Sequence, residues 1–201
     1  LRDPIIKVEE IIKKRKKNKF NRKKNNIYIA IGRLTRQKNF LFLLKCFQEL
    51  INKDKKIFLY ILGEGENFQE MTDFINKNNL SSNVFLEGYK ENIYEYLINS
   101  KAFILSSLWE DPGFVLIEAG FSNTTIISSN CKNGPVEILN NSKNGYLFNS
   151  NDKKSFLDTI NIFENDDENT IYRKKVEAKK MSRKFSLFNH YNELNKLLQN
   201  L

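Results

Sequence analysis

Two carboxylates, Glu110 and Glu118, bracket one short stretch of the chain with seven residues between them. The apolar run 101–107 that precedes them is typical of a buried parallel strand. Pro112 and Gly113 cannot continue that strand, and apolar residues then recur at helical spacing. Glu110 is therefore predicted in a strand-to-helix loop, and Glu118 about one turn into the helix. Ligands bind at that edge of an open α/β sheet, and two carboxylates there suit hydrogen bonds from sugar hydroxyl groups.

The elements that would position these carboxylates alternate between strands and helices. Strands are predicted at 27–32, 57–62, 84–86, 103–106, 125–128 and 145–148, and helices at 5–17, 39–52, 67–78, 93–99, 114–121, 136–139, 153–164, 168–183 and 187–201. Repeated strand–helix units favour an α/β fold, a Rossmann-like parallel sheet of about six strands with helices on both faces.

Composition indicates one globular domain. The chain has 201 residues, of which 40% are hydrophobic, and no apolar run approaches the roughly 20 residues that a membrane span needs. No signal peptide is predicted, and the first residue is not Met, so we expect a piece of a longer protein. Two cysteines are too few for a disulfide framework, which favours a cytoplasmic location.

The net charge of +9 is concentrated at the start of the chain. Residues 1–26 hold 11 Lys and Arg against 3 Asp and Glu. Two interpretations are open: a solvated basic linker between domains, or a patch for nucleic acid or an anionic membrane. Aromatic residues do not interleave the charges as single-strand binding requires, which favours the linker. We expect no nucleic-acid partner, and leave open a peripheral contact with the inner face of the cell membrane.

The loop after the first predicted strand combines glycine with cations. Gly32 lets the backbone turn close to a ligand, while Arg33 and Lys38 supply fixed positive charge before a helix N-terminus. These features suit a diphosphate, although an ordinary surface loop with solvated cations has the same composition.

Three further loops lie at the same predicted sheet edge. The pair Gly63 and Gly65 follows the second strand, but the dinucleotide fingerprint Gly-x-Gly-x-x-Gly is not present there. Gly88 follows the third strand and could admit a flat ligand such as a nucleobase. The backbone N–H groups of 113–115 lie at a helix start, where a phosphate or sugar oxygen binds well.

The combined order of these motifs resembles the C-terminal half of family-4 glycosyltransferases, which have the GT-B fold. The motifs are Gly-Arg-Leu-x-x-x-Lys-Asn from residue 32, Gly-x-Gly from 63, Phe-x-x-Gly from 85, Glu-x7-Glu from 110, Gly-Pro-x-Glu-Ile-Leu from 134 and Asn-Gly-Tyr-Leu-Phe from 144. The resemblance covers residues 27–200 and implies one half of a GT-B fold. It also implies that residues 1–26 are the inter-domain linker and that the last helix crosses back toward the N-terminal domain.

The resemblance implies a role for each charged motif. Arg33 and Lys38, next to Gly32, would hold the diphosphate of a sugar-nucleotide donor. Glu118 would accept hydrogen bonds from the ribose, and Glu110 would contact hydroxyls of the transferred sugar. Glu110, Arg33 and Lys38 are thus the expected catalytic residues.

Backbone groups complete the donor site that the resemblance implies. The N–H groups of Gly113, Phe114 and Val115 would contact the sugar and phosphate. Backbone groups near Glu87 and Gly88 would bind the base.

The activity implied is that of a hexosyltransferase. It would transfer a sugar from a nucleotide diphosphate sugar, with UDP favoured, to a glycan or lipid-linked acceptor in bacterial surface polysaccharide synthesis. The family retains anomeric configuration and needs neither a resident metal nor a cofactor. The family's acceptor-binding N-terminal domain is not in this sequence, so the chain alone should bind a donor better than it catalyses transfer. The alternative is a non-catalytic module that binds a sugar nucleotide or phosphosugar.

Two features depart from the family pattern or fall outside it. The family commonly has Gly-Phe-Gly after the first glutamate, where this chain has Asp111, Pro112 and Gly113. Proline lacks an N–H donor and Asp111 adds a charge, which leaves the identity of the sugar open. His190, the only histidine, falls in the last predicted helix and is expected to be structural.

Overall fold

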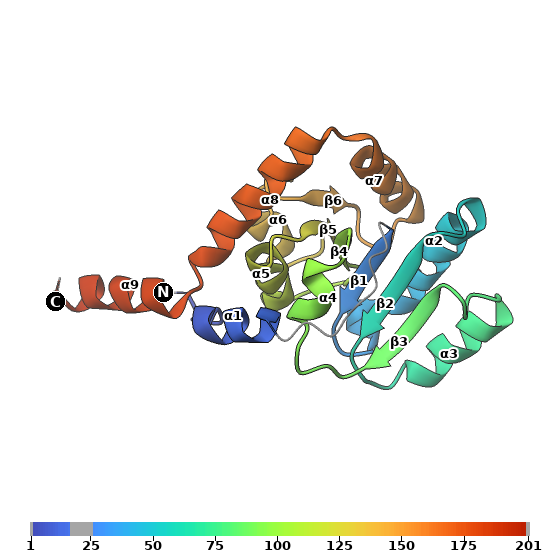
Figure 1. Ribbon diagram of the computed structural model, residues 1–201, viewed down its shortest axis with the longest axis horizontal. Coiled ribbons are helices and arrows are strands. Elements are labelled where there is room, and N and C mark those ends of the chain that lie inside the picture. The colour runs from blue at the N-terminus through green and yellow to red at the C-terminus, as the bar shows by residue number, and fades with distance from the viewer. Residues whose placement is uncertain (1, 17–25, 200–201) are drawn as a thin grey trace.

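The computed structural model describes residues 2–16 and 26–199, and its centre is a parallel sheet of six strands in the order β3-β2-β1-β4-β5-β6 (Figure 1). The strands are β1 (Ile27–Ile31), β2 (Phe58–Leu62), β3 (Val84–Gly88), β4 (Ala102–Leu105), β5 (Thr125–Ser129) and β6 (Tyr146–Phe148). Apolar runs buried on both faces form such a sheet only when helices cover both sides. The predicted Rossmann-like class is confirmed, and each predicted strand lies within two residues of an observed one.

The strand order reverses between β1 and β4. From β1 the chain adds β2 and then β3 on one side, and then crosses to add β4, β5 and β6 on the other. A crevice opens at such a reversal, outside the carboxyl ends of the two central strands. The loops that follow β1 and β4 are therefore neighbours, although about 70 residues separate them in the chain.

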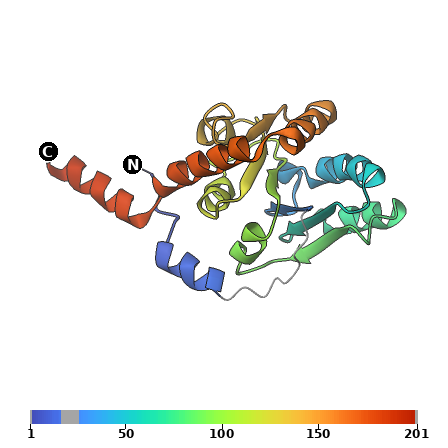
Figure 2. The same ribbon diagram turned by 45° about the horizontal axis from the view of Figure 1, so that its top comes forward.

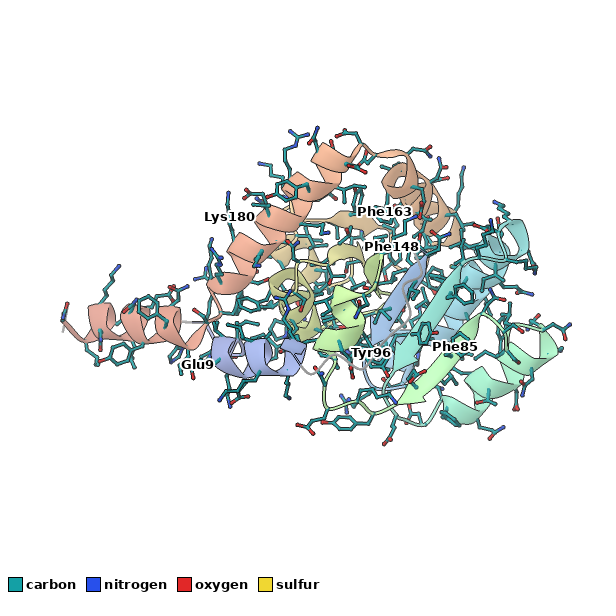
Figure 3. The ribbon with its side chains drawn as sticks, in the orientation of Figure 1. Glu9, Phe85, Tyr96, Phe148, Phe163 and Lys180 are labelled. Carbon is teal, nitrogen blue, oxygen red and sulfur yellow. The ribbon has the colours of Figure 1, made fainter. Side chains whose placement is uncertain are left out.

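Helices cover the two faces of the sheet as separate layers (Figures 1 and 2). One face carries α2 (Phe40–Lys53), α3 (Phe68–Lys77) and α7 (Lys153–Asn165); the other carries α1 (Val8–Lys16), α4 (Tyr94–Ile98), α5 (Phe114–Phe121), α6 (Pro135–Ile138) and α8 (Glu168–Arg183). Aromatic rings pack within the first layer: Phe148 and Phe156 meet edge to face at 5.1 Å, and Phe163 of α7 meets Tyr146 edge to face at 5.4 Å (Figure 3). The rigid layers fix the loops at the sheet edge.

The described part of the basic leader packs against the domain. Ile6 and Ile11 are buried in the same hydrophobic cluster as α5, and the Ile6 N–H donates to the Phe185 carbonyl at 3.0 Å. The helix predicted from residue 5 begins at Val8, and residues 17–25 lie outside the described part of the chain.

The last helix, α9 (Leu187–Gln199), extends away from the body of the domain (Figures 1 and 2). None of its described residues is buried, and it exposes a row of apolar side chains. The row consists of Leu187, Phe188, Tyr191, Leu197 and Leu198. Nδ1 of His190 lies 2.7 Å from the Arg2 carbonyl, which fastens the base of α9 to the start of the chain. Within the ranges 2–16 and 26–199, no helix has the length and apolar character needed to cross a bilayer.

Candidate functional site

The side chains of Lys38 and Glu110 form a buried ion pair at the reversal of strand order. The Lys38 ammonium lies 2.6 Å from Oε1 of Glu110, and the two side chains are only 14% and 4% exposed. The Ser107 hydroxyl donates to the same oxygen at 2.5 Å. A buried pair of this kind needs good geometry and extra hydrogen bonds to offset its desolvation. Lys38 and Glu110 were each predicted in the site, but their direct contact was not.

The two loops that carry this pair are held together by backbone and amide hydrogen bonds. Lys38 ends a single 3-10 turn, Arg36–Lys38, that sequence reasoning missed. The Leu108 N–H donates to the Gln37 carbonyl at 2.8 Å, and the Gln37 amide donates to the Trp109 carbonyl at 3.0 Å. These bonds fix the separation of the lysine and the glutamate before any ligand arrives.

The start of α5 lies against the Glu110 carboxylate. Gly113 takes φ of 87°, a conformation that favours glycine, and the helix begins at the next residue. A β-carbon at Gly113 would lie 3.3 Å from Cγ of Glu110 and 3.5 Å from its Oε2. The first N–H groups of a helix have no partner within the helix, and they favour negative charge. Phe114 and Val115 thus lie where the sequence predicted them, at a helix start beside a carboxylate.

Glu118 lies four residues further along α5 than Phe114, partly buried beside α4. Its Oε1 accepts a hydrogen bond from the Tyr94 hydroxyl at 3.3 Å. Burial raises the pKa of the Glu118 carboxyl, while the Tyr94 hydrogen bond and the charge of Lys14 act in the opposite direction. The hydrogen bond that the Glu118 carboxylate accepts from Tyr94 is therefore a long and weak one.

Replacing Glu118 with glutamine is expected to stabilise the folded domain at pH 7. A carboxyl whose pKa is raised in the folded state lowers the free energy of unfolding when it is charged. That destabilisation disappears as pH falls through the folded-state pKa, because the group is then neutral. Glutamine keeps an acceptor for Tyr94 without the charge. Urea unfolding of both proteins should show a higher midpoint for Glu118→Gln at pH 7 and no difference below about pH 4. A constant difference across that range would contradict the assignment.

A cavity of about 390 Å³ opens beside the carboxyl ends of β1, β2 and β3. Its lining comprises Ile31, Gly32, Arg33, Leu62, Gly63, Glu64, Tyr89, Lys90 and Ile93. A largely apolar lining with a few charged groups is typical of a small-molecule site. Gly32 and Arg33 thus lie where the sequence placed them, and Tyr89, which sequence reasoning missed, adds an aromatic ring that is 71% exposed.

Glu87 and Gly88 lie within β3 and not in a loop after it. The predicted strand ended at residue 86, but a register shift opposite Ile61 and Leu62 lets the pairing continue to Gly88. The Gly88 carbonyl accepts from the Gly63 N–H at 2.8 Å, and the Glu87 carboxylate is 3.0 Å from the Tyr96 hydroxyl and 3.2 Å from the Lys90 ammonium. Neither Glu87 nor Gly88 lines the cavity, whereas the two residues that follow them, Tyr89 and Lys90, do.

A second cavity, of about 290 Å³, lies at the opposite, amino-terminal edge of the sheet. Its polar groups pair with one another, because the Tyr28 hydroxyl and the Lys101 ammonium both donate to Glu164. The Lys38–Glu110 pair and the start of α5 lie instead at the carboxyl edge of the sheet. Within the described part of the chain, no three His, Cys, Asp or Glu side chains gather as metal ligands would.

Comparison with known proteins identifies the family. The family model described as "Glycosyl transferases group 1" matches residues 11–183. An uncharacterized glycosyltransferase of Methanocaldococcus jannaschii is 42% identical over 130 residues, which are 65% of this chain and 32% of that protein. A poly(ribitol-phosphate) α-N-acetylglucosaminyltransferase of Staphylococcus aureus is 29% identical over 137 residues, 68% of this chain and 28% of that protein.

A solved structure shows the same fold. It is a TarM variant of S. aureus in complex with fondaparinux, α-GlcNAc-glycerol and UDP. Its TM-score is 0.76 and its sequence identity to this chain is 24%. The match covers 89% of this chain and 36% of the TarM chain. The chain spans 28–36% of the length of these three proteins. The match of the family model over most of the sequence shows that the chain belongs to the group 1 glycosyl transferases.

Proposed function

We propose that this chain is the donor-binding domain of a hexosyltransferase, and that it binds a nucleotide diphosphate sugar whose nucleotide is UDP. The observation that carries the proposal is the buried Lys38–Glu110 pair, which lies beside a helix start at the reversal of strand order. The chain's membership of the glycosyl transferase family supports the reaction class. The UDP bound to the TarM variant supports UDP as the nucleotide. The expected acceptor is a glycan or lipid-linked molecule, as the name of the poly(ribitol-phosphate) relative suggests.

In the proposed complex, the donor extends from the cavity to Glu110. The base occupies the cavity next to Tyr89, and Glu118 accepts hydrogen bonds from the ribose hydroxyls. Arg33 and Lys38 hold the diphosphate, together with the N–H groups at the start of α5. The transferred sugar then lies against Glu110, whose carboxylate accepts from its hydroxyls.

The same residues would promote loss of the nucleotide. Breaking the glycosidic bond of the donor builds negative charge on the β-phosphate. Arg33, Lys38 and the α5 N-terminus stabilise that charge more strongly in the transition state than in the ground state. Glu110 orients the sugar for attack by the acceptor.

The acceptor would bind mainly to a second domain of the intact protein. We assign residues 27–201 to the donor domain and residues 1–26 to the segment that joins it to an acceptor domain. The exposed apolar row of α9 supports a docking partner there, because contiguous exposed apolar patches mark interaction sites. The proposed location is the cytoplasm, at the inner face of the cell membrane if the basic leader contacts lipid.

A donor-turnover assay on the intact protein tests the proposal. UDP-, GDP- and ADP-sugars are offered in turn, with and without candidate glycan acceptors. Release of the nucleoside diphosphate measures turnover, and calorimetric titration of each sugar nucleotide measures binding. We expect release from a UDP-sugar. Tight binding without turnover for every sugar would favour the alternative, a non-catalytic binding module, and neither binding nor turnover would contradict both.

A further inference from the structure

Two consecutive serines follow β4, and they contact the two loops that carry Lys38 and Glu110. Ser106 and Ser107 are both fully buried. The Ser106 hydroxyl donates to the Lys38 carbonyl at 2.8 Å, and the Ser107 hydroxyl donates to Oε1 of Glu110 at 2.5 Å. Two consecutive residues therefore contact both loops that carry the ion pair.

Ser107 is itself fixed by its neighbours in the sheet. Its carbonyl accepts hydrogen bonds from the Ser129 hydroxyl at 2.7 Å and from the Ser150 hydroxyl at 3.2 Å. Ser129 ends β5, and Ser150 follows β6. The chain is therefore tied across the carboxyl ends of three adjacent strands at this residue, and the backbone that carries the Ser107 hydroxyl is held in place.

The two oxygens of Glu110 differ in their surroundings. Oε1 accepts from both the Lys38 ammonium and the Ser107 hydroxyl. Oε2 lies on the side of Gly113, at the start of α5. A carboxylate held by one oxygen presents the other in a defined direction.

We propose that Ser106 and Ser107 are positioning residues for the donor, an inference that rests on the proposed function. Ser107 holds Oε1, so that Oε2 of Glu110 meets a hydroxyl of the transferred sugar. Ser106 holds the backbone of Lys38 and so fixes where that side chain starts. The Lys38 ammonium then binds Glu110 with one proton and has two protons left for the diphosphate. Without the Ser107 hydroxyl, the carboxylate turns both oxygens to the lysine and loses its alignment with the sugar. Misalignment of this kind lowers turnover more than nucleotide affinity.

Four variants of the intact protein test this proposal. Ser107→Ala removes the hydroxyl, Ser107→Thr restores one, and Ser106→Ala removes the other contact. Ser122→Ala is the matched control, because the Ser122 hydroxyl is buried at the end of α5 and has no partner among the described residues. Turnover of the preferred UDP-sugar gives kcat, and calorimetric titration with UDP gives the affinity.

We expect Ser107→Ala to lower kcat on the order of tenfold, with UDP affinity changed less than about twofold. Ser107→Thr should recover most of the loss, and Ser122→Ala should match the unmodified protein. Ser106→Ala should instead weaken UDP binding, since it frees the backbone of Lys38. An unchanged kcat in Ser107→Ala, or an equal fall of kcat and UDP affinity that threonine does not restore, would overturn the proposal.

A crystal structure of unliganded Ser107→Ala decides the positioning role even if nucleotide binding fails. We expect the Glu110 carboxylate to rotate and to approach Lys38 with both oxygens. A carboxylate in its original place would contradict the role of Ser107. If the unmodified protein binds no nucleotide while the carboxylate does rotate, the proposed function fails and the positioning of Glu110 by Ser107 stands.

Discussion

Replacing Lys38 with methionine is expected to lower donor turnover by the intact protein about 100- to 1,000-fold, the loss typical of removing one donor from a site of developing negative charge. The Lys38 ammonium lies 2.6 Å from Glu110 at a helix start, where the proposed leaving phosphate gathers charge. Methionine preserves much of the side-chain volume and removes only the charge and its hydrogen bonds. The measurement is kcat/KM for the preferred UDP-sugar.

The same substitution is expected to destabilise the domain, and a second substitution separates the two effects. Lys38→Met leaves the Glu110 carboxylate buried without its cation, which costs about 3 kcal/mol or more. The double variant Lys38→Met with Glu110→Gln has no buried charge and should regain most of that stability, because glutamine still accepts from Ser107. Its turnover should stay low.

A return of activity with stability would contradict the role assigned to Lys38. Lys53→Met is the matched control, since Lys53 is an exposed lysine on α2 whose partner Glu49 is also solvent-accessible. An exposed pair of this kind contributes little to stability, so the control should unfold close to the midpoint of the unmodified protein. Comparable losses of stability in Lys38→Met and Lys53→Met would show that the buried pair contributes no more to stability than an exposed pair does.

Replacing Gly63 with alanine is expected to lower the free energy of unfolding by more than about 3 kcal/mol. Gly63 has φ of 139°, and an added β-carbon would lie 1.9 Å from the Gly32 carbonyl oxygen. That oxygen belongs to the backbone at the end of β1 and cannot move without separating β1 from β2, which are tied there by the Gly32 N–H to Leu62 carbonyl hydrogen bond at 3.0 Å. Urea unfolding followed by circular dichroism measures the loss.

Gly88→Ala is the control for this prediction. Gly88 also has a positive φ, of 69°, but an added β-carbon would meet only a Glu64 carboxylate oxygen at 3.9 Å. Only the left-handed conformation opposes alanine there, which costs about 1–2 kcal/mol. Equal losses at the two glycines would mean that backbone conformation, and not the close approach of β1 and β2, requires glycine at Gly63.

The sequence predicted the elements and the charged motifs because both depend on local patterns. The helix 114–121 was placed at its observed bounds, since Gly113 permits the turn and apolar residues then recur at helical spacing. Gly32, Arg33, Lys38, Glu110 and Glu118 were chosen because each follows a predicted strand. The first four lie at the carboxyl edge of the sheet, as parallel strands require, and Glu118 lies one turn into the helix that starts there.

Contacts between distant segments could not be predicted in the same way. The pairing of Lys38 with Glu110 depends on the order of the strands, and local periodicity carries no information on which strands are neighbours. The contacts of Ser106 and Ser107 with these loops were missed for the same reason, although two hydroxyl residues at the end of an apolar run are a usable signal. The extension of β3 to Gly88 depends on a register shift against β2.

The charge of the basic leader, residues 1–26, did not indicate that part of it packs against the domain. Its charge favoured a solvated linker, yet Ile6 and Ile11 are buried against the body of the domain. Ile6 and Ile11 are five residues apart and do not repeat at helical spacing, so the sequence pattern cannot distinguish a packed leader from a free one.

Calorimetric titration of UDP into this chain tests the central claim most directly. We predict binding with one site, weakened at least about tenfold by Arg33→Ala and by Glu118→Ala, since each removes a charged hydrogen-bonding group. Glu137→Ala, at an exposed glutamate on α6, should bind UDP as the unmodified chain does. No heat of binding, or the same affinity in all four proteins, would contradict the assignment of a nucleotide site to the carboxyl edge of the sheet.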